Sequence, residues 1–218
     1  MLSEQGFTIV SCPFDGDGLN NAIDAHDRAI AAARPDETRV GSASTRVNGL
    51  LDHAPELAAI FTHPPVLAAA AALIGGAFKL SAFHSRSLRP GVEAEALHQD
   101  VAPGRDGWPL VGFIFMIDPF NIENGATRFL AASAELISLP ETPTEACLCH
   151  ACGQAGALIL FDGSVWHGHG TNTTRHWRRS VQGALMPKAA TAAVDHRRNL
   201  RPEIWAALPR DARMVIEP

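Results

Sequence analysis

The sequence predicts an α+β chain with an antiparallel β-sandwich or barrel at its centre. With 218 residues, the chain is long enough to bury one core without disulfide or metal crosslinks. Apolar residues recur at helical spacing in the first third, up to Gly76. After Gly76, short apolar runs are separated by Pro, Gly, Asp and Asn, which is the pattern of several short strands.

The first third is expected to contain one strand and three helices. The strand ends before Pro13 and the first helix stops before Pro35, because proline interrupts both kinds of element. A loop should follow the first helix. In chain order, the strand is expected over 6–11 and the helices over Leu19–Ala33, Pro55–Phe61 and Pro65–Leu73.

Six further strands are expected, and they would carry the functional site. Their limits are Phe78–Leu88, Ala96–Val101, Leu110–Ile117, Ala126–Leu130, Ala157–Phe161 and Arg179–Met186. The chain has no internal repeat and no low-complexity linker. We therefore expect one domain over 1–218, with a helical buttress over about 15–75, a β core over about 77–187 and a C-terminal extension over about 188–218.

Composition restricts the possible partners and the compartment. The net charge of −5 argues against nucleic acid or an anionic membrane as the main partner. The N-terminus lacks a secretory signal pattern, and the longest apolar stretch, 66–78, is shorter than the roughly 20 residues that cross a bilayer. Three of the four cysteines lie within six residues, which disfavours a disulfide framework. These features predict a cytoplasmic protein.

His98-Gln99-Asp100 is the strongest chemical signal in the sequence. On a strand, residues i and i+2 project from the same face, so the imidazole and the carboxylate could reach one metal ion. A later strand leads into His167, which would supply a third ligand. Two histidines and one carboxylate on one face of an octahedral ion form the facial triad of non-haem Fe(II) oxygenases. Because His-x-Asp also occurs by chance, ordinary strand polarity is the alternative for this motif alone.

Arg178 follows His167 by eleven residues. The intervening glycines suit a tight turn, so a hairpin would bring Arg178 back towards the metal on the neighbouring strand. A fixed guanidinium there could hold a distal carboxylate by two parallel hydrogen bonds. Strand alternation lets only one of Arg178 and Arg179 point inward, and the sequence leaves open which one.

Taken in order, these motifs resemble the phytanoyl-CoA dioxygenase family of Fe(II)/2-oxoglutarate-dependent oxygenases. The resemblance covers most of the chain, from Gly6 to about Met186. It rests on Leu97–Asp100, Glu123–Phe129, Gly156–Asp162, Trp166-His167 and Asn172–Ser180. It implies a double-stranded β-helix (a jelly roll, cupin-like) buttressed by N-terminal helices. In that fold, His98, Asp100 and His167 would be the catalytic iron ligands, and Arg178 would anchor 2-oxoglutarate.

The resemblance also implies the reaction. Fe(II), the co-substrate 2-oxoglutarate and O2 would be required, with ascorbate as a stimulant. A C–H bond of a small organic metabolite would be oxidised, with release of succinate and CO2. Related halogenases replace the triad carboxylate with a small residue, so Asp100 favours a hydroxylase over a halogenase.

Further residues are candidates for ligand contacts. By the same resemblance, Thr127 and His169 would lie near the co-substrate, although Thr127 could equally fill a strand position. His84, Ser85 and Arg86 lie on the strand expected before the triad, and one face of that strand could line the substrate pocket. A structural ion pair is the alternative for Arg86. Two residues of the loop after Asp100 could touch the substrate, namely Arg105 and Trp108.

The sequence departs from the family at three places. The family continues its Asn-Gly-Ala segment into Pro-Gly-Ser-His, whereas this chain reads Ala131-Ala-Ser-Ala134, which leaves the conformation of that loop open. The position two residues after the distal histidine is often a small hydroxyl residue, and here it is His169. The chain is also short before its first strand. None of these departures affects the triad.

Two other functions are compatible with the sequence. Cys147, Cys149, His150 and Cys152 could bind zinc, in a hydrolase or a zinc-stapled domain, although four ligands from six consecutive residues would be cramped. A catalytically inactive jelly-roll binding protein is the second alternative, and the intact triad and Arg178 argue against it.

Overall fold

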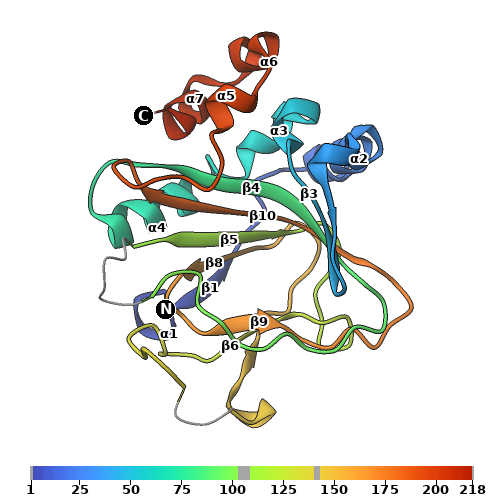
Figure 1. The fold of residues 1–218 in the computed structure, drawn as a ribbon, viewed down its shortest axis with the longest axis vertical. Coiled ribbons are helices and arrows are strands. Elements are labelled where there is room, and N and C mark those ends of the chain that lie inside the picture. The colour runs from blue at the N-terminus through green and yellow to red at the C-terminus, as the bar shows by residue number, and fades with distance from the viewer. Residues whose placement is uncertain (1, 103–108, 140–142, 218) are drawn as a thin grey trace.

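The computed structural model describes residues 2–102, 109–139 and 143–217. Its strands form two antiparallel sheets that face each other (Figure 1). The larger sheet has the order β1-β8-β5-β10-β4-β3-β2 and the smaller sheet has the order β7-β6-β9. The strands are β1 (Phe7–Val10), β2 (Thr38–Val40), β3 (Ser44–Val47), β4 (Phe78–Leu88), β5 (Val111–Met116), β6 (Thr127–Phe129), β7 (Cys149–His150), β8 (Leu158–Asp162), β9 (His167–His169) and β10 (Arg178–Pro187). This is the jelly-roll fold that the sequence predicts.

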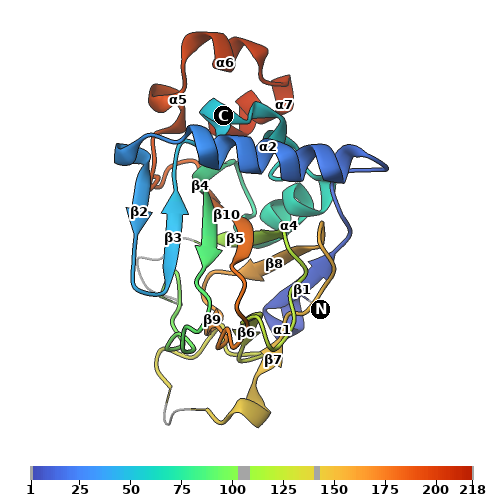
Figure 2. The same cartoon turned by 90° about the vertical axis from the view of Figure 1, so that its right-hand side faces the viewer.

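Helices α2 to α7 cover the outer face of the larger sheet, on the side away from the smaller sheet (Figures 1 and 2). The α-helices are α1 (Leu2–Gln5), α2 (Gly18–Ala32), α3 (Leu50–His53), α4 (Pro64–Ile74), α5 (His196–Asn199), α6 (Pro202–Ala207) and α7 (Arg210–Ile216). Three short 3-10 helices lie at Pro35–Glu37, Pro55–Ala59 and Glu145–Cys147. Every helix in the described part of the chain is too short or too polar to span a membrane.

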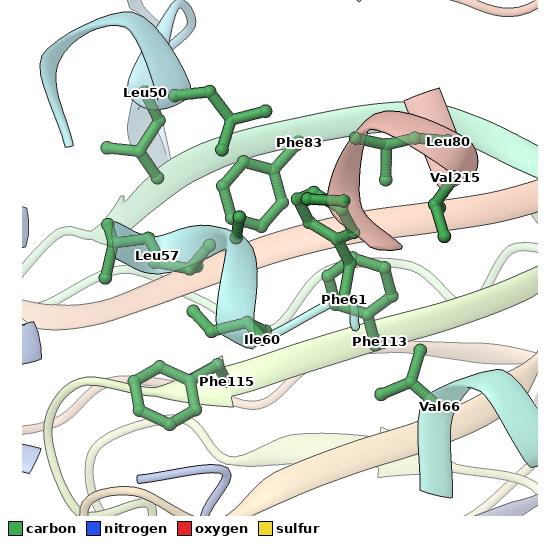
Figure 3. Close-up of a cluster of buried hydrophobic side chains, with 14 of the residues drawn as sticks. Leu50, Leu57, Ile60, Phe61, Val66, Leu80, Phe83, Phe113, Phe115 and Val215 are labelled. Carbon is green, nitrogen blue, oxygen red and sulfur yellow. The ribbon is translucent and has the colours of Figure 1, made fainter. Parts of the chain in front are cut away.

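The main apolar core lies between these helices and the larger sheet. Figure 3 shows Phe61, from the segment before α4, beside Phe83 of β4, and their rings meet edge to face with centroids 5.3 Å apart. A second core fills part of the space between the sheets, where Phe129 of β6 approaches Phe161 of β8 at 5.6 Å. Each buried phenylalanine contributes about 1.5–3 kcal/mol. The two cores fix the larger sheet from both sides, so that its inward-facing polar residues are held in place.

The strand expected over 96–101 is absent, although the other expected strands agree with the structure to within one residue at each end. His98 forms one isolated bridge with His167. The backbone N–H groups of Asp100 and Val101 then both donate to the carbonyl of Gly163, at 2.8 and 3.1 Å. Because one carbonyl receives both donors, the backbone turns there and no ladder continues. The prediction of a strand was therefore wrong, although the two side chains still converge.

The expected hairpin between His167 and Arg178 was also wrong. β9 belongs to the smaller sheet and β10 to the larger sheet, so residues 170–177 cross from one sheet to the other. Asn172 is buried in this crossing, and its side-chain amide donates to the carbonyls of Arg89 (3.0 Å) and His176 (2.9 Å). Arg178 nevertheless faces the same cavity as His167, because the two sheets form its opposite walls.

Several elements were not expected from the sequence. The loop expected before Gly49 contains the β2–β3 hairpin, whose residues are mostly half-buried or exposed and so lack a clear apolar alternation. Helices α5, α6 and α7 fold back onto the main core through Leu208, Ala212 and Val215. These short helices bury few side chains each, which explains why their apolar periodicity is weak.

Candidate active site

Three possible metal ligands converge at the edge of the cavity between the sheets. Their ligand atoms, from His98, Asp100 and His167, all lie within 4.8 Å of one another. The Nε2 atoms of the two histidines are each 3.9 Å from an oxygen of Asp100. The backbones of His98 and His167 exchange N–H···O bonds of 2.9 Å in both directions, which fixes the spacing of the two rings. This donor set of two imidazoles and one carboxylate could hold a divalent metal ion.

The surroundings of His167 favour a neutral imidazole with a free Nε2 lone pair. Its Nδ1–H donates to the carbonyl of Val165 at 2.9 Å, since a carbonyl can only accept. Its ring lies 4.7 Å from the ring of Phe161 and 5.6 Å from that of Phe129. Burial lowers the pKa of His167, and the charge of Asp100 opposes this only in part. The tautomer and the orientation are those of a histidine that binds metal through Nε2.

The loop that carries Asp100 is held by its neighbours in sequence. The side-chain amide of Gln99 donates to the carbonyls of Ser164 and, at 3.1 Å, of Leu136. The backbone N–H of Asp100 donates to the carbonyl of Gly163. These contacts tie the segment to the β8–β9 connection. His98, Asp100 and His167 are thus positioned by one hydrogen-bonded unit, although only His167 lies in a strand.

Arg178 is the inward-pointing residue of the Arg178-Arg179 pair. Its side chain is 1% exposed, its Nη1 donates to the carbonyl of Gly125, and its guanidinium carbon lies 4.1 Å from the ring centroid of Phe120. Its Nε and Nη2 are buried and have no hydrogen-bond partner among the described residues. Burial lowers the pKa of Arg178 to about 9. Arg179 instead faces outward and pairs with Asp118 (2.7 Å) and Asp27 (2.6 Å).

Arg178 and the three possible metal ligands line one cavity of about 280 Å³. Thr127 and His169 also line it, from directly opposed positions on β6 and β9, and both are buried. His169 donates from Nδ1 to the carbonyl of Gly170 at 2.9 Å, and its pKa is lowered by burial. The cavity therefore combines a candidate metal site with a buried, incompletely paired cation.

The cavity also includes residues that were only partly foreseen. Arg86 lines it and pairs with Glu95 at 3.3 Å, so the alternative of a structural ion pair is observed. Burial alone would raise the pKa of Glu95, but Arg86 and His169 hold it below its usual range. Sequence reasoning missed Glu95, Arg46 and Gln182 as lining residues. Arg105 and Trp108 lie outside the described residues.

The cysteine segment does not form a comparable site. Cys147, Cys149 and Cys152 are exposed and form no disulfide, and the Nε2 of His150 lies 3.4 Å from Glu145. Among the described residues, the group whose ligand atoms gather closely enough for a metal ion is the one around Asp100, and it includes no thiol. The structure therefore gives no support to the zinc alternative.

The loop that departs from the family keeps an unusual backbone. Ala132 has φ +56°, the left-handed region that favours glycine, and it occupies the place of the glycine in the family's Pro-Gly-Ser. The hydroxyl of Ser133 donates to the carbonyl of Leu130 at 2.6 Å and accepts from the N–H of Trp166 at 3.0 Å. Ser133 thus ties this loop to the residue before His167, and the loop contains an alanine in a strained conformation.

The fold and the site together define a class of protein: a double-stranded β-helix with a two-histidine, one-carboxylate group and a buried arginine in one cavity. Comparison with family models agrees with this class. Residues 2–180 match the model described as "Phytanoyl-CoA dioxygenase (PhyH)", and the chain belongs to this family.

Sequence relatives carry dioxygenase names. The chain is 30% identical over 167 residues to "Dioxygenase af480" of Aspergillus fumigatus and 31% identical over 167 residues to "Dioxygenase trt7" of Aspergillus terreus. These matches cover 73% and 72% of this chain but only 51% and 58% of the two relatives. The chain thus spans little more than half the length of these curated relatives.

Solved structures share the fold at lower identity. The epimerase SnoN, in complex with Fe3+, alpha ketoglutarate and nogalamycin RO, has a TM-score of 0.67 at 21% identity, over 88% of this chain and 83% of that chain. HygX from Streptomyces hygroscopicus, with nickel, 2-oxoglutarate and hygromycin B bound, also has a TM-score of 0.67, at 12% identity, over 88% of this chain and 86% of that chain. At these identities the likeness shows the fold.

Proposed function

We propose that this protein is an Fe(II)- and 2-oxoglutarate-dependent dioxygenase that hydroxylates a small organic molecule. The observation that carries the proposal is one cavity lined both by the His98–Asp100–His167 group and by Arg178. The Nε and Nη2 of Arg178 have no partner among the described residues, so they are free for an anionic ligand. Family membership and the dioxygenase names of the relatives support this proposal.

The donor set fits Fe(II). His98, Asp100 and His167 would hold the metal, because two imidazole nitrogens and one carboxylate oxygen from one side leave the other positions to small ligands. The chemistry that iron supplies when bound is the activation of O2 at the expense of 2-oxoglutarate, which yields succinate, CO2 and the hydroxylated substrate. The chain itself contributes binding, orientation and a partly apolar wall with Leu110, Ile114 and Phe161.

Arg178 would hold the far carboxylate of 2-oxoglutarate. Two parallel hydrogen bonds from a guanidinium match a carboxylate in geometry, and both would form where water is largely excluded. The hydroxyl of Thr127 and the Nε2 of His169 would contact the same co-substrate from the smaller sheet. Asp100 favours hydroxylation over halogenation, since a halide would need the position that this carboxylate takes. SnoN has the same fold and is an epimerase, so the fold alone does not determine the reaction. We propose hydroxylation on the basis of Asp100.

The decisive experiment measures succinate from 2-oxoglutarate with Fe(II), O2 and ascorbate, together with the visible absorption of the anaerobic Fe(II)–2-oxoglutarate sample. We expect turnover and a weak charge-transfer band. Asp100→Ala should lose at least about 100-fold of the succinate formed, because removal of a metal ligand exceeds the 10–100-fold that outer contacts cost. Cys149→Ser is the matched control and should be unchanged.

Other outcomes separate the alternatives. The absorption band without succinate, across a broad substrate panel, would indicate a binding protein without turnover. Zinc in place of iron in the purified protein, lost in Cys149→Ser, would indicate a zinc site. Unchanged succinate formation by Asp100→Ala would overturn the assignment of the ligands.

A further inference from the structure

Three arginines occupy directly opposed positions on neighbouring strands of the larger sheet. Arg39 of β2 pairs in register with Arg46 of β3, and Arg46 pairs with Arg86 of β4. Side chains directly opposite on antiparallel strands share one face, with Cβ atoms about 5 Å apart, and like charges in such pairs are destabilising. Arg46 and Arg86 both line the cavity, so the shared face is the one that looks into it.

In the described part of the chain, acidic side chains form an ion pair with only one arginine of this row. Glu95 pairs with Arg86 at 3.3 Å and also accepts from the backbone N–H of His169 at 3.4 Å. Arg46 and Arg39 form no ion pair with any residue that the structure describes. Glu95 and Asp100 both act on Arg46 electrostatically, but Glu95 is paired with Arg86 and the carboxylate of Asp100 belongs to the candidate metal site. Arg46 thus presents an uncompensated positive charge.

Arg46 also remains uncompensated when the charges of a cavity with bound Fe(II) and 2-oxoglutarate are added up. Fe(II) carries two positive charges, Asp100 one negative charge and 2-oxoglutarate two negative charges. Their sum is one negative charge, which Arg178 offsets. Glu95 is offset by Arg86. Arg46 then remains as one surplus positive charge on the wall. Because Arg46 is both an exposed residue and a lining residue, this charge lies where the cavity meets solvent.

A second observation points to a ligand near this charge. His84 lies two residues before Arg86 on the same strand face and lines the cavity, and its Nε2 is buried with no hydrogen-bond partner among the described residues. Burial and the nearby arginines lower the pKa of His84 to about 3, so the ring is neutral and its Nε2 can accept or donate. An unpaired buried nitrogen destabilises the protein unless a ligand satisfies it.

We infer that the primary substrate carries a carboxylate, which Arg46 binds while His84 contacts a polar group further inside. This inference rests on the proposed function, since it assigns the substrate of the same cavity. The single surplus charge fits a monocarboxylate better than a dianionic phosphate. The apolar lining from Leu110, Ile114 and Phe161 suits a hydrocarbon body for that acid.

The test is calorimetric binding to protein loaded with Ni(II) and saturating 2-oxoglutarate, so that no probe can occupy the site at Arg178. The probes are matched pairs that differ only in charge: octanoate and octanamide, phenylacetate and phenylacetamide, cyclohexanecarboxylate and its amide. We expect at least one acid to bind about tenfold or more tightly than its amide, the effect of one charge-assisted hydrogen-bonded contact. Arg46→Gln should reduce the preference to less than about twofold, and Arg46→Lys should keep part of it.

Arg39→Gln is the matched control, because Arg39 occupies the same row without lining the cavity, and it should keep the preference for acids. No preference in the wild-type protein, including no binding of any acid, would overturn the inference. So would a preference that survives in Arg46→Gln. The titration of 2-oxoglutarate into the same Ni(II) protein keeps the two proposals apart: failure of that titration contradicts the proposed function, whereas its success without a preference for acids contradicts only the role of Arg46.

Discussion

Replacing Arg178 with methionine should weaken co-substrate binding without destabilising the folded chain. Methionine keeps an unbranched side chain of similar reach but removes the charge and the N–H donors. The buried guanidinium now makes one hydrogen bond, to Gly125, and one stacking contact, with Phe120. Its Nε and Nη2 remain without partners in the described structure. The contacts to the protein are therefore few for a group that is buried to this extent.

The loss in binding follows from two charge-assisted hydrogen bonds in a buried site. Truncating one partner of such a pair costs about 2–5 kcal/mol, so the Kd of 2-oxoglutarate should rise by roughly 30- to 5,000-fold. In the absence of co-substrate, the free energy of unfolding of Arg178→Met should instead be higher than that of the wild type. Relief of two buried, unpaired N–H groups, at about 1–3 kcal/mol each, outweighs the lost hydrogen bond and the cation–π contact, leaving a net gain of about 1 kcal/mol. For a chain of this size that gain raises the Tm by about 2–4 °C.

The assay combines calorimetric titration of 2-oxoglutarate into Ni(II)-loaded protein with thermal unfolding in its absence. Arg179→Met is the matched control, because Arg179 is adjacent in sequence but pairs with Asp118 and Asp27 outside the cavity. We expect that control to bind 2-oxoglutarate normally and to unfold at lower temperature. A Kd for Arg178→Met within threefold of the wild type would refute the role as anchor. A large loss of stability would show that Arg178 is instead a structural residue.

Three further predictions test the surroundings of the site. Burial lowers the pKa of His196 to about 4, so the unfolded chain binds the extra proton first as pH falls below about 6.5. The contribution of His196 to stability is full above that pH and should fall by about 2 kcal/mol at about pH 5. Because His84 and other buried histidines add losses of their own, urea unfolding of His196→Gln should show a drop that is smaller than the wild-type drop by this amount. Ala132→Gly should stabilise the chain by about 0.5 kcal/mol, because glycine adopts the left-handed conformation without the strain that alanine has there, whereas Ala131→Gly should destabilise the chain. Thermal unfolding compares the two variants, and a lower Tm for Ala132→Gly than for the wild type would contradict the strain at Ala132. Gly112→Ala should lower the free energy of unfolding by about 1–3 kcal/mol and weaken Ni(II) binding, because its Cβ would collide with the Phe161 ring that packs on His167. In the control Gly76→Ala the added Cβ has no neighbour within 4 Å, so neither calorimetric Ni(II) binding nor thermal unfolding should change.

The triad residues could be predicted because their signal is local. His98 and Asp100 are two residues apart, and His167 lies five residues after the end of the strongly apolar strand β8. Strand alternation nevertheless does not explain how His98 and Asp100 converge, since their segment is a turn fixed by the carbonyl of Gly163. Two side chains at positions i and i+2 can also converge in a turn. The residues were thus identifiable where the backbone was not.

Arg46 and Glu95 could not be predicted as cavity residues, because the signal that places them there is not local. Arg46 faces the cavity only through the pairing of β3 with β4, and the β2–β3 hairpin has too little apolar alternation to be recognised. Glu95 lies in an extended segment without regular structure, and its role depends on Arg86 and His169 approaching from other elements. Register between distant strands is set by the whole sheet, so a one-dimensional pattern does not contain it.

The sequence also could not decide whether Arg178 or Arg179 is buried, because this too depends on strand register. Both residues have identical side chains, and their positions differ by one residue, so only the register of β10 against β4 decides which is buried. In the structure the outward residue has two carboxylate partners, and the inward residue has none among the described residues. The consequence for function comes from this asymmetry: a fully paired guanidinium stabilises the fold, whereas an incompletely paired one is available to a ligand.

The distribution of unpaired polar atoms supports that view of the cavity. Of the seven buried side-chain nitrogens without a partner in the described part of the chain, three belong to Arg178 and His84, which line one cavity. Each such atom costs about 1–3 kcal/mol, a large fraction of a typical total stability of about 5–15 kcal/mol. Apolar packing cannot offset this cost locally, but an anionic co-substrate and an acidic substrate would. The groups whose unpaired burial lowers the stability of the protein are therefore the groups through which ligand binding would stabilise it.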